Sequence, residues 1–176
     1  MTIEFNIIDS GVLPGVKIIT PSVFDERRGQ IWTSYDGELL DELLPEDLFF
    51  KHDKFSTSHA NVLRGIHGDH KSWKLVSCVF GNIRQVVVDM RTSSEAYLKY
   101  ESFDLGDENR SMILIPPGMG NAFYVQSPLA VYHYKLAYKG GYIDAGQQFT
   151  VPWNDTRLKI DWPSNNPILS ERDARN

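Results

Sequence analysis

Hydrophobic residues from position 74 onward fall in short runs rich in Val, Ile, Phe and Tyr, the residue types that strands favour. Turn residues such as Gly81-Asn82 and Pro116-Pro117-Gly118 separate these runs. The expected strands cover residues 74–80, 83–90, 98–105, 112–115, 122–125 and 131–137. Short strands divided by turns predict an all-β protein, an antiparallel sandwich or barrel.

Two other segments have helical features. Residues 37–44 carry four leucines at helical spacing, and Pro45 is expected to end that helix; residues 170–173 have the outline of a capped turn. No internal repeat, low-complexity tract or linker divides the chain. We therefore expect residues 1–176 to form one domain, which is long enough to bury a substantial core.

Charge and composition indicate which classes of binding partner and which cell compartment suit this domain. Charged residues make up 23% of the chain and its net charge is −5, which argues against a nucleic-acid partner but permits a local site for a nucleotide phosphate. The start lacks a signal-peptide pattern, and no run approaches the roughly 20 apolar residues of a membrane span. The single Cys78 is expected to be a core thiol in a reducing compartment. We predict a soluble cytoplasmic protein with no membrane partner.

The segment Val62-Leu63-Arg64-Gly65-Ile66-His67 carries the first candidate chemistry. Strand alternation predicts that Arg64 and Ile66 share one face and that Leu63, Gly65 and His67 share the other. Gly65 would leave open space for a ligand. Arginine suits a phosphate, and histidine can act as a base near neutral pH. The alternative is a buried structural histidine.

A second candidate lies in the segment Tyr132-His133-Tyr134-Lys135. Alternation puts Tyr132 and Tyr134 on one face, so a tyrosine of this strand is expected to face His67 across the interior of the barrel. The alternative is two ordinary amphipathic strand residues. Asp155 lies between aromatic residues, where it would either cap a turn or orient an imidazole.

Phosphate-binding loops and metal sites are not indicated. Neither GxGxxG nor GxxxxGK[ST] occurs, so side chains such as Arg64, Arg28 and Lys74 would have to hold a nucleotide. His67 and His70 would lie on opposite strand faces, and the remaining histidines form no compact set with a carboxylate. We expect no metal and no cofactor.

Motifs along nearly the whole chain carry a resemblance. They are Phe24-Asp25-Glu26-Arg27-Arg28-Gly29, Ser56-Thr57-Ser58, Val62 to His67, Lys74-Leu75-Val76, Val88-Asp89-Met90-Arg91, Ile115-Pro116-Pro117-Gly118, Tyr134-Lys135, Trp153-Asn154-Asp155, Asp161-Trp162-Pro163 and Leu169-Ser170-Glu171-Arg172-Asp173. In this order they resemble the dTDP-4-dehydrorhamnose 3,5-epimerase family, metal-free enzymes with a cupin-type jelly-roll fold. The resemblance implies that fold and an epimerase that acts on a nucleotide-linked 4-keto sugar.

The resemblance also implies residue roles. His67 matches the catalytic base, Asp155 the carboxylate paired with it, Tyr134 the general acid, and Lys74 the lysine that faces the 4-keto oxygen. Arg64 matches the arginine at the diphosphate, and Arg28 an arginine that in this family can come from the partner subunit of a homodimer. The other expected substrate-binding residues are Ser56, Asn121 and Tyr138.

The chain departs from the usual family pattern at three places, of which one is His52-Asp53-Lys54-Phe55 before Ser56, where the family has Gln-x-Asn-x. Gly68-Asp69 follow His67 where the family has Phe-Gln, and Asn121 stands where the family has a second histidine. This set is similar to a branch of capsular polysaccharide biosynthesis that acts on GDP-linked 4-keto-heptoses, including 6-deoxy forms. A GDP-4-keto-(6-deoxy-)heptose is therefore the expected substrate, and dTDP-4-dehydrorhamnose chemistry is the alternative.

The expected reaction inverts C3, and C5 in some substrates, by removal and return of a proton through an enolate. Three alternatives stay open from the residues: a metal-dependent cupin oxygenase, a 3,4-ketoisomerase, and a sugar-binding jelly roll without catalysis. The oxygenase would need three or four convergent metal ligands. The sugar-binding protein would have no need of His67, Lys74 and Tyr134 together.

Overall fold

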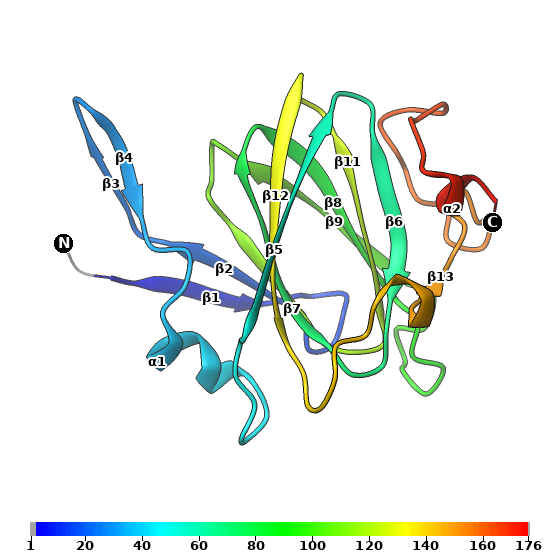
Figure 1. Ribbon diagram of the computed structural model, residues 1–176, viewed down its shortest axis with the longest axis horizontal. Coiled ribbons are helices and arrows are strands. Elements are labelled where there is room, and N and C mark those ends of the chain that lie inside the picture. The colour runs from blue at the N-terminus through cyan, green and yellow to red at the C-terminus, as the bar shows by residue number, and fades with distance from the viewer. Residues whose placement is uncertain (1–2, 176) are drawn as a thin grey trace.

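The computed structural model describes residues 3–175, which form two large antiparallel sheets, a separate hairpin and a few short helices (Figure 1). The strands are β1 Phe5–Asp9, β2 Lys17–Pro21, β3 Val23–Glu26, β4 Gly29–Trp32, β5 His52–His59, β6 Leu63–Gly68, β7 Trp73–Phe80, β8 Asn82–Asp89, β9 Tyr100–Gly106, β10 Met112–Ile115, β11 Met119–Val125, β12 Leu129–Ala137 and β13 Phe149–Thr150. The helices are α1 Gly37–Leu40 and α2 Glu171–Ala174, and two 3₁₀ turns cover Asp41–Leu43 and Ala145–Gln147.

The two large sheets confirm the predicted antiparallel sandwich. One has the strand order β1-β2-β10-β7-β12-β5 and the other the order β13-β6-β11-β8-β9. The apolar core between them includes Val76, Cys78 and Tyr132 from the first sheet and Val87 and Phe123 from the second. Burial raises the pKa of the Cys78 thiol to about 11, so this cysteine is the core thiol that the sequence indicates.

Both outer faces of the sandwich are also covered. Leu40, Leu44 and Phe50, from the segment around α1, pack over the first sheet. The segment that includes Leu158 and Trp162 packs over β6, β8 and β11 of the second sheet. This second cover matters for function, because the chain continues from it into α2 beside β6.

The six predicted strands are all present, with ends shifted by a few residues. The helix expected over residues 37–44 is α-helical only at Gly37–Leu40 and continues as a 3₁₀ turn that ends before Pro45. Asp36 caps its start, since the Asp36 carboxylate accepts the N–H of Glu38. Strands β1 to β5 were not expected. β1–β2 and β3–β4 are local hairpins that the sequence analysis missed, whereas β2 and β5 also pair with β10 and β12, which lie far along the sequence.

The hairpin β3–β4 forms a sheet of its own and extends away from the sandwich (Figure 1). Arg28 lies in its turn, exposed, and pairs with Glu26 of the same hairpin. Val23, Phe24 and Ile31 of the hairpin are 40% to 50% exposed. The hairpin therefore presents apolar side chains that the sandwich does not bury.

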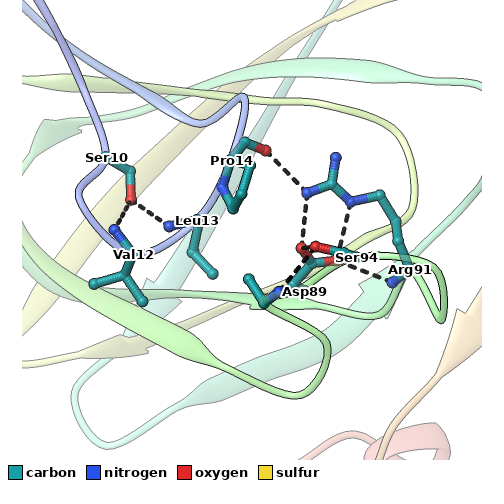
Figure 2. A network of polar contacts seen from close by, with 8 residues as sticks. Ser10, Val12, Leu13, Pro14, Asp89, Arg91 and Ser94 are labelled. Atoms are coloured by element: carbon teal, nitrogen blue, oxygen red, sulfur yellow. Dashed lines mark hydrogen bonds and ion pairs between the residues drawn. The ribbon is translucent and has the colours of Figure 1, made fainter.

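A buried carboxylate ties the end of β8 to the loop between β1 and β2 (Figure 2). Asp89 is fully buried and accepts hydrogen bonds from the backbone N–H and guanidinium of Arg91 and from the Ser94 hydroxyl. Arg91 also donates to the Pro14 carbonyl at 2.9 Å. Burial alone would raise the pKa of Asp89, but these hydrogen bonds outweigh it and the pKa is lowered.

Within residues 3–175, no helix is long and apolar enough to cross a membrane.

Asp89→Asn should lower the free energy of unfolding by about 2 to 4 kcal/mol, because it leaves the Arg91 guanidinium without its buried counter-charge. Asp104→Asn, which breaks the exposed pair with Arg84, should cost less than about 1 kcal/mol. Urea unfolding of both variants at pH 7 measures the difference. Because the folded pKa of Asp89 is lowered, its contribution is present above pH about 4 and is lost in acid, so wild type and Asp89→Asn should converge there. Equal stability at pH 7 would contradict the role assigned to Asp89.

Candidate active site

A cavity of about 620 Å³ opens between the two sheets, within the usual size range of small-molecule sites. Strands β5, β6, β7, β11 and β12 supply its walls, and the segments 142–148 and 170–173 close it. Most of the candidate residues of the sequence line it; these are Ser56, Arg64, His67, Lys74, Asn121 and Tyr134.

A bulge in β6 brings Arg64 and His67 onto the same wall. His67 pairs with Asn121 of β11 and Arg64 pairs with Phe123, so three steps on β6 oppose two on β11. The expected opposite faces for Arg64 and His67 are therefore wrong, because the extra residue changes the phase of the alternation. Gly65, at φ 115°, leaves no open space for a ligand: a Cβ there would lie 2.5 Å from the Asn121 carbonyl oxygen.

The His67 imidazole is paired with Asp173. The two side chains approach to 2.5 Å between His67 Nε2 and Asp173 Oδ1, and Asp173 is 3% exposed. Burial favours the neutral acid, but the hydrogen bonds and charge of His67, with Ser170 and Gly65, lower the pKa of Asp173. Asp173 is thus a carboxylate at neutral pH, and it accepts the Nε2–H and leaves Nδ1 as the free basic nitrogen.

The sequence predicted a capped turn at residues 170–173, which the structure shows as α2, but it did not indicate that Asp173 pairs with His67. Ser170 caps the helix by accepting the N–H of Asp173, and this capping pattern accounts for Asp173 locally. Its position beside β6 depends on a parallel bridge between Val62 and Ile168, a long-range contact that no local pattern predicts. The only available signal was that Asp173 belongs to one of the family-like motifs.

The expected pairing of Asp155 with His67 is wrong. Asp155 forms an ion pair with Arg157 and accepts its backbone N–H at 2.9 Å, which makes it the cap of a turn. The Arg157 hydrogen bonds hold the pKa of Asp155 low. Asp155 lies near Trp153, and Asp173 lies in the turn that Ser170 caps, so both fit a local turn in the sequence. The sequence alone therefore did not show which of the two aspartates pairs with His67.

Tyr132 and Tyr134 both line the cavity, as strand alternation predicts, while His133 and Lys135 lie on the other face and pair with Asp53. Tyr132 is fully buried and donates to Gln85 at 3.0 Å. Tyr134 is less enclosed. Burial raises its pKa, opposed by the charges of Lys54 and Arg64, so the Tyr134 hydroxyl keeps its proton at neutral pH.

Lys74 lies in β7, 8% exposed, with its ammonium at the cavity. Desolvation lowers its pKa, and the Asp69 carboxylate, 3.9 Å away, opposes that effect. An ammonium in such a site is a strong donor for an oxygen on which negative charge develops.

Three further cavity residues, Ser56, Asn121 and Arg64, differ in their hydrogen bonds to the protein. The Ser56 hydroxyl is buried, and within residues 3–175 it has no hydrogen-bond partner. Asn121 accepts from Gln85 at 2.6 Å, which fixes its side-chain oxygen. Arg64 donates through Nε to the Ser58 hydroxyl at 2.9 Å and through Nη2 to the Thr57 carbonyl at 3.5 Å, and it lines the cavity.

Besides Asp155, two candidate residues lie outside the lining of this cavity. Tyr138 contacts His52 through a 3.3 Å hydrogen bond and lies under the Lys51 ammonium. Arg28 is in the projecting hairpin and pairs with Glu26. Among the described side chains, no group of three His, Cys, Asp or Glu comes together to hold a metal ion.

The profile of the dTDP-4-dehydrorhamnose 3,5-epimerase family matches residues 11–176. This chain belongs to that family. The family's Salmonella typhimurium dTDP-4-dehydrorhamnose 3,5-epimerase is 34% identical over 172 residues, 96% of this chain and 92% of the relative. A Streptomyces niveus dTDP-4-dehydrorhamnose 3-epimerase is 32% identical and covers 92% of this chain and 78% of its own length.

Among family members of known structure, the dTDP-6-deoxy-D-glucose-3,5-epimerase of Legionella pneumophila, solved with dTDP-4-keto-L-rhamnose, superposes with a TM-score of 0.89. It is 33% identical and the match covers 98% of this chain and 91% of that one. This match confirms the cupin-type jelly-roll fold. Family membership also makes the protein an isomerase, a nucleotide-sugar epimerase, and decides against the non-catalytic sugar-binding alternative.

Asp173→Asn should reduce the epimerase kcat by about 100-fold or more, because the amide neither holds His67 in the same tautomer nor stabilises its charged form. Asp155→Asn is the matched control and should keep nearly wild-type kcat, since it alters only a turn at Arg157. Epimer formation from a dTDP-linked 4-keto sugar, followed by NMR, measures both. Equal losses in the two variants would show that Asp173 has no special part in catalysis.

Proposed function

We propose that this epimerase inverts C3, or C3 and C5, of a nucleotide-diphosphate-linked 4-keto sugar through an enolate. One observation carries the proposal: the cavity has a carboxylate-held histidine on one sheet, a protonated tyrosine on the other, and a buried lysine beside them. These are the three groups that removal, stabilisation and return of a proton next to a ketone require.

In the proposed mechanism His67 takes the proton from the carbon next to the ketone. Asp173 fixes the tautomer and stabilises the imidazolium that forms. The electrons of the broken C–H bond move into the enolate, whose oxygen accepts a hydrogen bond from the Lys74 ammonium. Tyr134, on β12 of the opposite sheet, then gives its proton to the other face of the carbon, which inverts the centre. No cofactor takes part in this proton exchange.

The remaining cavity residues suit the rest of the substrate. Arg64 carries the fork geometry that binds a diphosphate, and the partnerless Ser56 hydroxyl is available to a sugar or phosphate oxygen. Asn121 offers its amide beside the base. Tyr138 borders the segment that closes the cavity and is proposed to contact the nucleotide end.

We also infer a homodimer in which Arg28 reaches the nucleotide end of the partner's cavity. The support is that Arg28 lies in a hairpin that leaves the sandwich (Figure 1). The same hairpin exposes Val23, Phe24 and Ile31. A second copy is the simplest cover for these side chains, because burial of apolar surface drives association.

The comparisons favour a dTDP-linked substrate of the dTDP-4-dehydrorhamnose type over the GDP-linked heptose that the sequence departures indicate. All the relatives and structures described above act on, or are named for, dTDP sugars. A GDP-4-keto-(6-deoxy-)heptose of capsule biosynthesis is the second candidate, on the departures of the sequence at Gly68 and Asn121 alone. The structure offers no added space at Gly68, because a Cβ there would lie 2.2 Å from the Met119 carbonyl oxygen and 2.3 Å from the Phe149 ring.

Incubation of the enzyme in heavy water with dTDP- and GDP-linked 4-keto sugars tests the function. The mass gain of the sugar counts the exchanged carbons, and product NMR separates 3-epimerisation, 3,5-epimerisation and 3,4-ketoisomerisation. His67→Asn should remain folded and lose exchange by about 100-fold to 10,000-fold. Full exchange by that variant, or no exchange from any of these sugars by the wild type, would overturn the proposed function.

Tyr134→Phe should separate proton removal from inversion. His67 and Lys74 remain, so the enolate still forms, but it is reprotonated mainly from the face that it left. Solvent deuterium should therefore enter C3 with retention while epimer formation falls far more steeply. Phenylalanine keeps nearly the same volume, so packing should survive. Deuterium uptake and inversion are measured on one sample, and a wild-type ratio between them would exclude Tyr134 as the acid.

A further inference from the structure

The Lys74 ammonium is enclosed by protein and faces opposing charges. Lys74 is 8% exposed and Asp69 is 5% exposed. The two side chains form an ion pair in which Asp69 Oδ2 lies 3.9 Å from Lys74 Nζ. Arg172 of α2 lines the same cavity, and its positive charge acts against that of Lys74. The other titratable groups that line the cavity are Lys54, Arg64, His67, Tyr132, Tyr134, Tyr142, Asp144 and Asp173.

The backbone of the turn between β6 and β7 fixes the Asp69 carboxylate. Asp69 Oδ1 accepts the N–H of Lys71 at 2.9 Å and the N–H of Ser72 at 2.6 Å. The Asp69 carbonyl also accepts the N–H of Gly118 at 2.8 Å. Because the turn holds Asp69 Oδ1 through these two hydrogen bonds, the other oxygen, Oδ2, is fixed in the direction of Lys74.

The separation in this pair preserves the donors of Lys74. A distance of 3.9 Å is too long for a hydrogen bond but short enough for a strong charge interaction in a buried site. Within residues 3–175 no hydrogen bond from the Lys74 ammonium to protein is recorded, so its N–H groups remain directed to a ligand in the cavity. A tighter pair would have used them.

We propose that Asp69 is a positioning residue that keeps Lys74 positively charged and directed at the ketone oxygen of the substrate. The inference rests on the proposed function, since it assigns Lys74 the enolate oxygen. It also accounts for one departure from the family pattern: a carboxylate stands where a neutral glutamine is usual, and glutamine would not offset the charge of Arg172.

Burial and Arg172 both lower the pKa of Lys74, and Asp69 is the group that raises it. Removal of the Asp69 charge should therefore allow Lys74 to lose its proton at a lower pH. Because the neutral amine lacks the positive charge that stabilises the enolate, the enzyme should then lose activity at a lower pH on the alkaline side of its profile.

The test uses Asp69→Asn, which keeps an oxygen for the N–H groups of Lys71 and Ser72 and removes only the charge. The protein is labelled with ¹³C at lysine Cε, and the Lys74 resonance is assigned by its absence from Lys74→Arg. In Asp69→Asn this resonance should titrate at lower pH than in wild type. The control Asp104→Asn removes an equal charge on β9 and should leave it unchanged. An unchanged Lys74 titration in Asp69→Asn would overturn the proposal.

Kinetics supply the second readout. In Asp69→Asn the alkaline limb of the kcat profile should move to lower pH by about one unit or more, with KM little changed and activity partly recovered at lower pH. A uniform fall in kcat at every pH would mean that Asp69 is merely structural and would overturn the proposal. Failure of the proposed function is separate, since it appears as a wild-type enzyme that exchanges no sugar, and the NMR titration decides the pairing of Asp69 with Lys74 in either case.

Discussion

A single extra residue in β6 determines the arrangement of the active site. In a regular strand Arg64 and His67 would point in opposite directions, one into the cavity and the other into the apolar layer that Leu63 and Ile66 form. The bulge opposite Asn121 and Phe123 removes that conflict, so Arg64 and His67, the proposed phosphate-binding cation and the proposed base, share one wall while both apolar residues stay buried. The proposed proton transfer requires His67 to lie in the same cavity as Tyr134, Lys74 and Asp173, and the bulge places it there.

Features set by local spacing were predictable from the sequence. The six later strands follow from apolar runs and turns, and the common face of Tyr132 and Tyr134 follows from the period of two in β12. The bulge was not predictable, because it exists only in the pairing of β6 with β11. The partner of His67 was missed for the same reason: Asp155 and Asp173 both look like turn caps locally, and 106 residues separate Asp173 from the histidine.

The cavity has an electrostatic character different from that of the whole chain. The protein carries a net charge of −5, yet the cavity is lined by Lys54, Arg64, Lys74 and Arg172. These cations create a local attraction for a diphosphate within an acidic surface that repels polyanions in general. The two buried carboxylates of the cavity are each paired, Asp173 with His67 and Asp69 with Lys74. Their negative charges therefore act mainly on these partners and do not cancel the attraction for a diphosphate.

The long separation between His67 and Asp173 also concerns folding. The strands of both sheets are complete by Thr150, and the segment that follows adds no strand but covers the apolar outer face of the second sheet. That segment docks on β6 through Leu158, Trp162 and the Ile168 bridge, and it carries the carboxylate into place. Local opening of this segment, at a lower free-energy cost than global unfolding, would inactivate an otherwise folded enzyme. Loss of activity on heating is then expected to report the docking of residues 151–173 before the melting of the jelly roll.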